Sequence, residues 1–282
     1  MPDVAGVGGC DGSGGRFRAA RRRPDDVCRQ GPLTSGTVTN GFDPRAELAH
    51  VHDAPGAWSF IRGFTSRWSQ QALSQGDSCD EAEIRSAEQR LGITLPQTLR
   101  DGYLLCGRHE YHLENPGAYV RPLDRLLRPD ELRLDEERTS VIYRVGPEFL
   151  VEWAACLTGE PDPPVVYRKP GSSAGWQDFL PSVSWAWVEM VVADALFSDD
   201  LGNDRELEHG DMARLEQGFS RLAIPDYPSW WTPPGGITRW FGGPDVILRE
   251  EAGIWLWARC RTAAALPEMR AAMPGDWWKL GH

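Results

Sequence analysis

The sequence predicts an α+β fold in which helices pack against a largely antiparallel sheet of about six strands. Three observations on the 282 residues lead to this prediction. Several segments repeat apolar residues at three- and four-residue steps, as on the buried face of a helix. Other short runs are rich in Val, Ile, Tyr and Trp and are separated by Gly and Pro turns. The order is helices, three strands, helices, three strands and a last helix, which indicates one domain over residues 57–282.

The first 45 residues differ from the rest, because they are rich in Gly, Arg, Pro and Ser and have almost no apolar periodicity. Such a segment buries too little apolar surface to offset the entropy lost on ordering. We therefore expect residues 1–45 to be a disordered extension. An alternative is a start codon assigned too early, with translation beginning near Val38 or Val51. Mass spectrometry of the native N-terminus separates the two, since an intact Met1 peptide contradicts the later start.

Three helices are predicted next. Residues 58–68 carry apolar side chains at three- and four-residue steps. Residues 78–92 begin with a capping box and end at a glycine, which suits the left-handed position after a helix. Residues 96–107 begin with a proline, which is favoured in the first helical turn, and end at a second glycine. The N-terminal part of the domain is therefore expected to be helical.

The middle of the chain predicts strands followed by helices. Short β-rich runs separated by Gly and Pro turns lie at 141–145, 149–156 and 165–167. A strongly apolar helix is predicted at 182–197, and a more polar helix at 204–219.

The C-terminal part predicts a meander and a last helix. Residues 225–236 hold four prolines and two tryptophans, which favours a surface connection. Turn-forming residues separate the next three strand-like runs, which are 237–241, 246–249 and 254–260. Thr262 is expected to cap the final helix, whose inward-facing residues are Leu266, Met269 and Met273.

The acidic composition narrows the class of partner. The net charge of −11 argues against a surface for nucleic acid or acidic membranes and favours a basic partner, if the partner is charged. Many proteins are this acidic without such a partner, so both interpretations stay open. No apolar run approaches the ~18 residues of a membrane span, and no secretory signal is recognisable. We expect a cytoplasmic location, with the six scattered cysteines reduced and mostly buried.

The search for catalytic or metal chemistry finds no complete site, so we expect neither an enzyme nor a cofactor. Gly6–Gly9 lacks the strand, helix and Lys-Ser/Thr ending of a phosphate loop. Cys106, His109 and His112 are spaced three apart and offer zinc-binding atoms. We favour a buried Cys106 and two surface histidines instead, because Gly107 ends the helix between them. No Ser or Cys lies in a nucleophile elbow.

The 13 tryptophans are unusual in number. Those within 185–187 belong to the apolar helix, and those within 255–257 alternate with apolar residues in a strand, so we expect these four in the core. The pairs at 230–231 and 277–278 are different, because exposed aromatic pairs are typical anchors of protein interfaces. For these two pairs, folding back onto the domain is the alternative.

One helix is predicted to end at Leu91-Gly92, a Leu95-Pro96 link follows, and the next helix carries Leu99, Arg100 and Tyr103 and ends at Gly107. This segment resembles the opening motif of the SUKH superfamily, which includes regulators of fungal cell-wall assembly and bacterial immunity proteins. In that motif a helix ends at Leu-Gly, a Leu-Pro link follows, and the next helix ends in a glycine. Residues 123–132 resemble the family's segment leading into the sheet, and 162–165 resemble its Asp-Pro-Pro-Val turn. The residues that carry the resemblance are Leu91, Gly92, Leu95, Pro96, Leu99, Arg100, Tyr103, Gly107, Asp162, Pro163, Pro164 and Val165.

The resemblance implies a single SUKH-like domain that binds another protein without catalysis. The first hypothesis is an immunity-type protein that binds and neutralises a toxin, such as a nuclease, of a polymorphic or contact-dependent system. The second is an intracellular scaffold or regulator of the cell-wall-assembly type, and the third is a metal-dependent enzyme built around His109 and His112. Many relatives carry a polar triplet where this chain has Val145–Glu148, so no binding role is transferred to that stretch.

The expected interface follows from charge density. A basic toxin would be attracted to exposed acidic loops, which speed association and favour the correct partner. We expect such loops beside the predicted strands and at the end of the third helix, with no direct contact to nucleic acid or membrane. The candidate residues are Glu110, Glu114, Asp130, Glu131, Asp135, Glu136 and Glu137.

Overall fold

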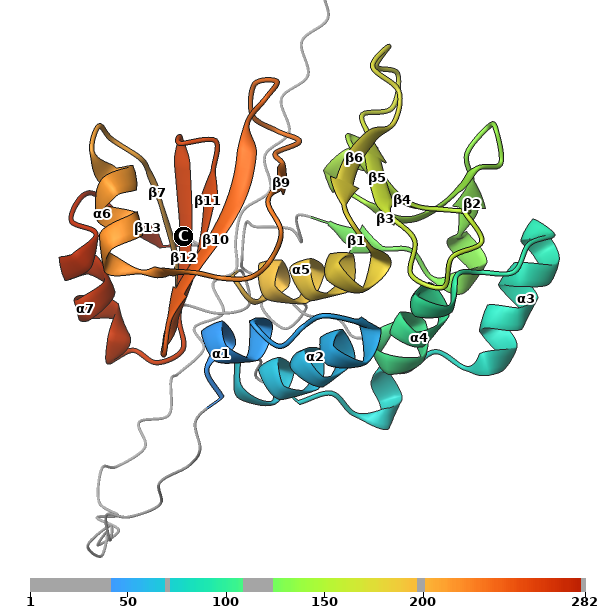
Figure 1. Ribbon diagram of the computed structural model, residues 1–282, viewed down its shortest axis with the longest axis horizontal. Helices are drawn as coiled ribbons and strands as arrows, with labels where there is room; N and C mark the ends of the chain where they lie inside the picture. Colours follow the sequence, from blue (N-terminus) through green and yellow to red (C-terminus); the bar gives the residue numbers. More distant parts are fainter. Residues whose placement is uncertain (1–41, 69–71, 109–123, 197–200, 280–282) are drawn as a thin grey trace, which may run out of the picture. The chain divides into compact units, whose positions relative to one another are not determined.

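The chain forms seven α-helices and two sheets within the residues that the computed structural model describes, which are 42–68, 72–108, 124–196 and 201–279 (Figure 1). The predicted α+β class is confirmed. Three short 3₁₀ turns, η1 to η3, cover Gln75–Asp77, Pro129–Glu131 and Pro147–Phe149. The helices are α1 Pro44–Leu48, α2 Ala54–Trp68, α3 Glu81–Leu91, α4 Gln97–Cys106, α5 Val183–Ala195, α6 Asp211–Gly218 and α7 Ala265–Ala272.

The first sheet has the strand order β1-β3-β4-β5-β6, with β2 also pairing to β3. Each of its strand pairs is antiparallel. The three predicted strands of this region are present as β3, β4 and β5, whereas β1, β2 and β6 were not predicted. The strands are β1 Arg125–Leu126, β2 Arg133–Leu134, β3 Ser140–Val145, β4 Glu152–Cys156, β5 Val165–Arg168 and β6 Gln177–Leu180.

The second sheet has the order β13-β7-β12-β11-β10-β8, with β9 pairing to β10, and its pairs are also antiparallel. The predicted meander is confirmed as β10–β12. The described residues form more than the expected six or so strands. Five of the unpredicted strands there have two residues, too few to show a periodicity, and the other two are β6 and β7. The strands are β7 Gly202–Glu206, β8 Ser220–Arg221, β9 Tyr227–Pro228, β10 Ile237–Gly243, β11 Val246–Glu251, β12 Trp255–Cys260 and β13 Trp278–Lys279.

The predicted helix at 204–219 is wrong in its first half. Strand β7 occupies residues 202–206, and α6 begins only at Asp211. The polar residues of β7 pair with β12, where Asp204 lies opposite Trp257 and Arg205 opposite Leu256. A polar segment becomes a strand here because a distant strand supplies its hydrogen-bond partners.

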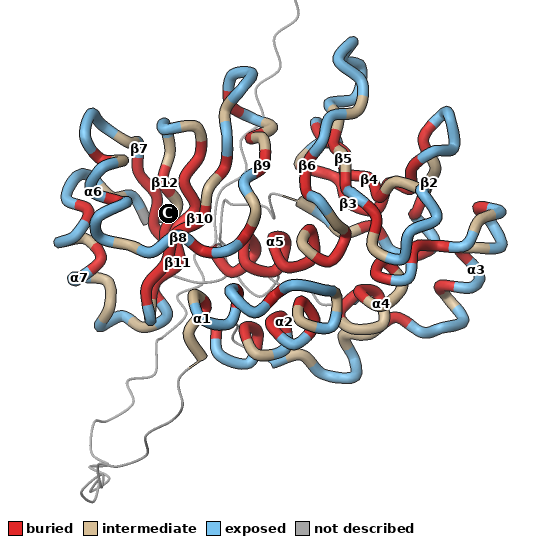
Figure 2. Tube along the Cα trace, in the orientation of Figure 1, coloured by how far each residue is buried: buried red, intermediate tan, exposed pale blue. Residues whose placement is uncertain are grey.

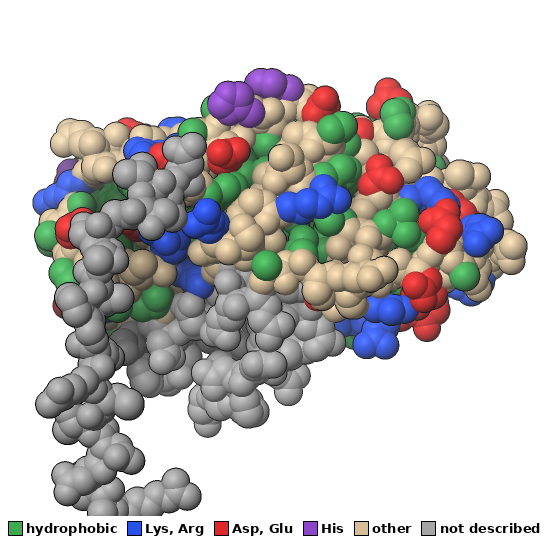
Figure 3. Space-filling model, turned by 90° about the horizontal axis from the view of Figure 1, so that it is seen from below, with side chains coloured by type: hydrophobic (Ala, Val, Ile, Leu, Met, Phe, Trp, Pro, Cys, Tyr) green, Lys and Arg blue, Asp and Glu red, His purple; other side chains and the backbone are tan. Residues whose placement is uncertain are grey.

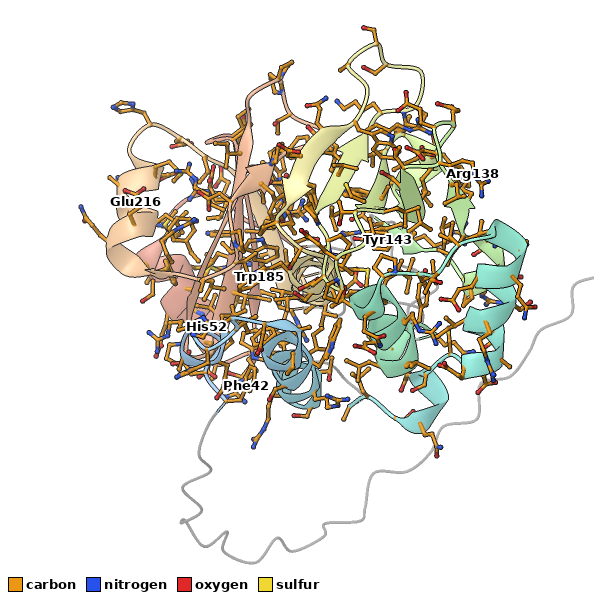
Figure 4. The ribbon with its side chains drawn as sticks, turned by 45° about the vertical axis from the view of Figure 1, so that its right-hand side comes forward. Phe42, His52, Arg138, Tyr143, Trp185 and Glu216 are labelled. Atoms are coloured by element: carbon orange, nitrogen blue, oxygen red, sulfur yellow. The ribbon has the colours of Figure 1, made fainter. Side chains whose placement is uncertain are left out.

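The folded part begins earlier than residue 57. Phe42 packs beside α2, with ring centroids 5.7 Å from Phe60 and 6.2 Å from Phe64 (Figure 4). Asp43 caps α1 by accepting a hydrogen bond from the Arg45 amide at 3.0 Å. The expected disordered extension is therefore shortened to end before Phe42, and its remaining residues, 1–41, lie outside the described ranges.

Helices α3 and α4 form the unit that the Leu-Pro motif predicted. The capping box is present, but Asp80 and Glu83 form it, with the Asp80 amide donating to Glu83 at 2.7 Å. Gly92 has a φ of 68°, the left-handed conformation that glycine adopts without strain. The Glu88 carboxylate accepts the amide of Leu95 at 2.9 Å and so orders the link between the helices.

The buried face of α4 packs against α5. Leu99 and Tyr103 are fully buried, and the Tyr103 hydroxyl donates to the carbonyl of Leu127 at 2.6 Å. Gly102 allows Trp187 of α5 to approach closely, since a Cβ at Gly102 would lie 2.1 Å from the indole. The spacing of the motif therefore builds helix packing, and Arg100 adds an ion pair with Glu88 at 2.7 Å.

The Asp-Pro-Pro-Val turn connects the first sheet to α5. The carboxylate of Asp162 accepts hydrogen bonds from the amide and hydroxyl of Ser184 in the first turn of α5, at 2.9 and 2.6 Å. The carbonyl of Pro163 accepts the Val183 amide at 2.9 Å, and that of Pro164 accepts the Cys156 amide at 3.0 Å. This turn is a structural element that orients α5 beneath the strands.

Helix α5 lies at the centre of the larger core. All of its residues except Trp185 are buried, as Figure 2 shows for the whole helix. Helices α2 and α4 pack against it. A second, smaller core lies between α6, α7 and the second sheet, and includes Met269 and Met273 as expected. Helix α7 begins at Ala265 and has Ala264 at its N-cap position, so the predicted cap at Thr262 was wrong.

Candidate functional site

The first sheet carries a cluster of paired charges, here called the charged face, formed by Arg133, Glu136, Glu152, Arg168 and Trp176. The carboxylate of Glu152 binds Arg133 at 2.5 Å and Arg168 at 2.9 Å. Glu136 lies 3.4 Å from Arg168, whose guanidinium is centred 4.4 Å over the Trp176 ring. The shared carboxylate of Glu152 fixes the positions of Arg133 and Arg168. Arg168 in turn connects the exposed Glu136 to this cluster.

Four of the predicted interface residues are exposed, namely Asp130, Glu131, Glu136 and Glu137. Glu131 also has a structural role, since it binds Arg125 at 2.7 Å. The turn that holds Glu136 and Glu137 is attached to the end of α3, where Arg138 donates to the carbonyl of Leu91 at 2.7 Å (Figure 4). The exposed carboxylates therefore extend from well-anchored turns.

The prediction that Asp135 belongs to an exposed interface is wrong, because its side chain is buried. Its carboxylate accepts the amides of Thr139 and Ser140 at 2.7 and 2.9 Å, which closes the β2–β3 turn. Burial raises the pKa of Asp135, but these hydrogen bonds outweigh it and hold the pKa below its ordinary value. Asp135 therefore stabilises the turn. Glu110 and Glu114 lie outside the described residues.

The turn between β3 and β4, residues 147–150, presents two apolar side chains to solvent. Phe149 is 54% exposed and Leu150 57%. Glu148 and Phe149 have φ values of 53° and 59°, in the left-handed region that residues other than glycine rarely adopt. Such a conformation costs of order 1–3 kcal/mol per residue and is found disproportionately at functional sites. The sequence analysis did not identify Phe149 and Leu150 as exposed candidates. The signal available in the sequence was a short connection between two strands whose central residues are neither Gly nor Asn.

A buried charge network links the first sheet to the second through α5. Arg144 of β3 lies between Asp124 and Glu189 of α5, with nitrogen–oxygen distances of 2.5 and 2.6 Å. Glu189 also accepts the hydroxyl of Tyr227 at 2.8 Å, and that hydroxyl accepts the indole N–H of Trp240 at 3.0 Å. The network therefore passes from β3 across α5 to β9 and β10.

The second sheet extends this network. Arg249 of β11 pairs with Glu251, which also accepts the indole N–H of Trp231. The Arg249 guanidinium lies 5.9 Å from the Trp240 ring centroid, next to the Tyr227 end of the network. Each charged side chain named here is at least nine-tenths buried. The network thus has the position of a structural link between the two sheets.

Burial changes the pKa values of the acids around this network. It raises the pKa of Asp194 well above its ordinary value, with Arg144 acting in the opposite direction. It also raises the pKa of Asp124 and of Glu251, again against nearby arginines. Desolvation works against the charge of Arg144, yet Asp124 and Glu189 hold the pKa of that guanidinium above its usual range. Burial thus opposes the ionisation of these acids, and the neighbouring carboxylates support the charge of Arg144.

We expect Asp194→Asn to weaken the pH dependence of stability. Because the folded-state pKa of Asp194 is raised, the folded protein binds more protons than the unfolded chain between that pKa and 3.8. The contribution of Asp194 to the stability of the folded protein is full below pH 3.8 and is lost as the pH rises through the folded-state pKa. Urea unfolding at about pH 5 and at about pH 8 gives the free energy of unfolding at each pH. The decrease from the lower to the higher pH should be smaller for the variant than for the wild type. The exposed Asp130→Asn should leave the loss unchanged, and equal losses in all three proteins would contradict the assignment.

The tryptophan pairs of the C-terminal half fold back onto the domain. Trp230 packs edge-on against Trp153 with centroids 6.4 Å apart, and Trp278 stacks on Trp255 at 5.8 Å. Trp231 is 41% exposed but is held by its hydrogen bond to Glu251. The predicted surface connection at 225–236 is accordingly wrong in part, because Tyr227 is buried within it. Trp230 thus packs on the first sheet, whereas Trp231 and Trp278 contact Trp255 of the second sheet and stay partly exposed, Trp278 by 50%.

Metal and thiol chemistry has little support in the described ranges. No three His, Cys, Asp or Glu side chains gather there in an arrangement that would hold a metal ion. Cys106 is buried as expected, and His109 and His112 lie outside the described residues. Burial raises the pKa of Cys79 and of Cys260 to about 11, which keeps both thiols protonated. None of the described helices is long and apolar enough to cross a membrane.

Comparisons with protein-family models, with curated proteins and with solved structures find no match to this chain. The SUKH resemblance therefore stands on the sequence motif. What the motif residues do in the structure is clear from their contacts: Leu91, Leu95, Leu99 and Tyr103 are buried between helices, and Asp162 caps α5. Their contacts explain the architecture of the helices and of the turn before α5.

Proposed function

We propose that this chain is a non-catalytic, SUKH-like protein-binding domain of the immunity type, which binds and neutralises a basic toxin of a polymorphic or contact-dependent system. The observation that carries the proposal is the concentration of exposed carboxylates on the turns of the first sheet. The turns supply Asp130, Glu131, Glu136, Glu137, Glu148 and Glu160, and strand β6 adds Asp178. Together with the net charge of −11, they favour a basic partner over nucleic acid or an acidic membrane.

The helical side of the domain fits this role less well. At the end formed by α3 and α4, acidic and basic side chains lie beside one another (Figure 3). Arg100 pairs with Glu88 at 2.7 Å, and Arg108 pairs with Glu83 at 2.6 Å. Paired surface charges attract a charged partner weakly, because each cation offsets its neighbouring anion.

On the first sheet Glu131 and Glu136 are paired too, with Arg125 and Arg168. Within the described residues no ion pair involves the exposed Asp130, Glu137 or Glu148, so we place the interface at the turns that carry these three carboxylates.

We expect charge reversal of Asp130, Glu136 and Glu137 to lysine to slow association with a basic toxin by at least about tenfold at low salt. The probe is a catalytically inactivated toxin domain encoded beside this gene, and stopped-flow or surface-plasmon measurements give the rate and its salt dependence. Loss of long-range attraction should also flatten the salt dependence.

A matched control reverses three exposed acids of the second sheet region, Glu208, Glu216 and Asp276. Glu216 lies on α6, away from the first sheet (Figure 4). This control keeps the same change in net charge, so it should retain most of the wild-type rate. If both triple variants lose the same fraction of the rate, the attraction is not localised on the first sheet.

The alternative function is an intracellular scaffold or regulator without a toxin. The same exposed acidic turns would serve such a protein, so the two are separated by the partners themselves. A gene neighbourhood without a secreted toxin, together with several endogenous partners in a pull-down, would favour the scaffold. Binding of one adjacent toxin with suppression of its toxicity would favour the immunity protein.

A further inference from the structure

The β3–β4 turn has the geometry of a two-residue hairpin but not the residues that such a hairpin favours. The Leu150 amide donates to the Pro147 carbonyl at 2.9 Å, and the Gly146 amide donates to the Val151 carbonyl at 2.9 Å. With positive φ at both central positions, this is the arrangement of a type I′ turn, which favours Asn-Gly. Here the central residues are Glu148 and Phe149. Their backbone is in the left-handed region, which is unfavourable for residues that carry a Cβ atom.

The base of this hairpin is rigid. Val151 and Trp153 are fully buried, and a Cβ at Gly146 would lie 2.3 Å from Val151. The exposed Phe149 and Leu150 therefore extend from a fixed support. Apolar side chains that are held in place before binding lose little conformational entropy on entering a pocket.

The charged side chains beside the turn are of both signs. Glu148 is exposed within it. Arg125 of β1 lies opposite Val145, two residues before the turn, and forms an ion pair with Glu131. The chain thus places two apolar anchors beside one exposed carboxylate and a surface ion pair, which is the pattern of an apolar interface centre with a charged rim.

We infer that the β3–β4 turn is the hydrophobic anchor of the partner interface. Phe149 and Leu150 enter an apolar pocket on a basic protein, and the positive rim of that pocket faces Glu148. The inference rests on the proposed function and specifies the contact residues that binding requires. Glu148 and Phe149 are strained in the free protein because their side chains serve the interface.

The test combines stability with binding. The variant Glu148→Asn/Phe149→Gly restores the residues that a type I′ turn favours and removes the aromatic anchor. We expect its thermal unfolding midpoint to rise while its affinity for the inactivated toxin domain falls at least tenfold. Leu150→Ser, which leaves both strained residues in place, should also weaken binding at least tenfold without raising the midpoint.

The matched control is Ile237→Ser, which removes an apolar side chain that is 47% exposed on the second sheet. It should bind as the wild type does. If the turn variants bind the toxin domain with wild-type affinity, the anchor is overturned while the immunity function stands. If the Asn-Gly variant is not more stable, the strain argument is overturned. If the wild type itself does not bind, the proposed function fails and the anchor fails with it.

Discussion

Replacing Arg144 by methionine is expected to lower the free energy of unfolding by about 3–5 kcal/mol, the range found when one partner of a buried ion pair is removed. The guanidinium is 1% exposed and neutralises both Asp124 and Glu189. Without it, two buried carboxyl groups face each other in a poorly solvated region and must take up a proton or remain unpaired. Urea unfolding followed by tryptophan fluorescence measures the change.

The matched control is Arg133→Met, which removes an arginine of the charged face. Its side chain is 39% exposed and solvent screens its ion pair with Glu152, so the loss should be below about 1 kcal/mol. Adding Asp124→Asn and Glu189→Gln to Arg144→Met should recover part of the stability, because no buried charge is then left unpaired. If Arg144→Met and Arg133→Met lower the free energy of unfolding equally, the buried network does not stabilise the fold more than an exposed ion pair does.

The second large effect is expected at Trp187, for which replacement by alanine should destabilise the fold by about 3–5 kcal/mol. The ring is fully buried on α5 and meets Tyr103 of α4 and Trp58 of α2 at centroid distances of 5.8 and 6.4 Å. Gly102 leaves the space that the indole fills, and alanine at 187 would convert it to a cavity that the surrounding helices close only in part. Thermal or urea unfolding gives the loss.

Trp185→Ala is the control on the same helix, because Trp185 is the one residue of α5 that is not buried. Its replacement should cost less than half as much as that of Trp187. The comparison keeps residue type and helix constant and varies only burial. A larger loss at Trp185 would contradict the packing of α5 described above.

The elements that were predicted well are those whose signals are local. Gly92 ends α3 because it adopts the left-handed conformation there, and Pro96 precedes α4 because proline suits the start of a helix. The meander of β10–β12 was predicted from its turn residues. Each of these assignments depends on contacts between residues a few positions apart, which sequence patterns describe directly.

The elements that were missed depend on distant partners. Strand β7 is polar and became a strand because β12 lies beside it. Asp135 has the composition of a surface loop, yet the β2–β3 turn folds over it and uses its carboxylate as a cap. The sequence pattern predicted a strand from residue 149, whereas Phe149 and Leu150 lie within the hairpin turn and are exposed.

By itself, the sequence determined the α+β class, the α3–α4 unit around Leu95 and Pro96, and the acidic character of the surface. Only the tertiary structure decided which charged side chains are buried in ion pairs and which are exposed. Arg144 and Glu189 are isolated charges in apolar segments 45 residues apart, and their ion pair forms because β3 packs over α5. Likewise, Glu136 is exposed and Asp135 is buried although they are neighbours in the chain. Burial is set by the packing of whole elements, so a local pattern cannot assign it.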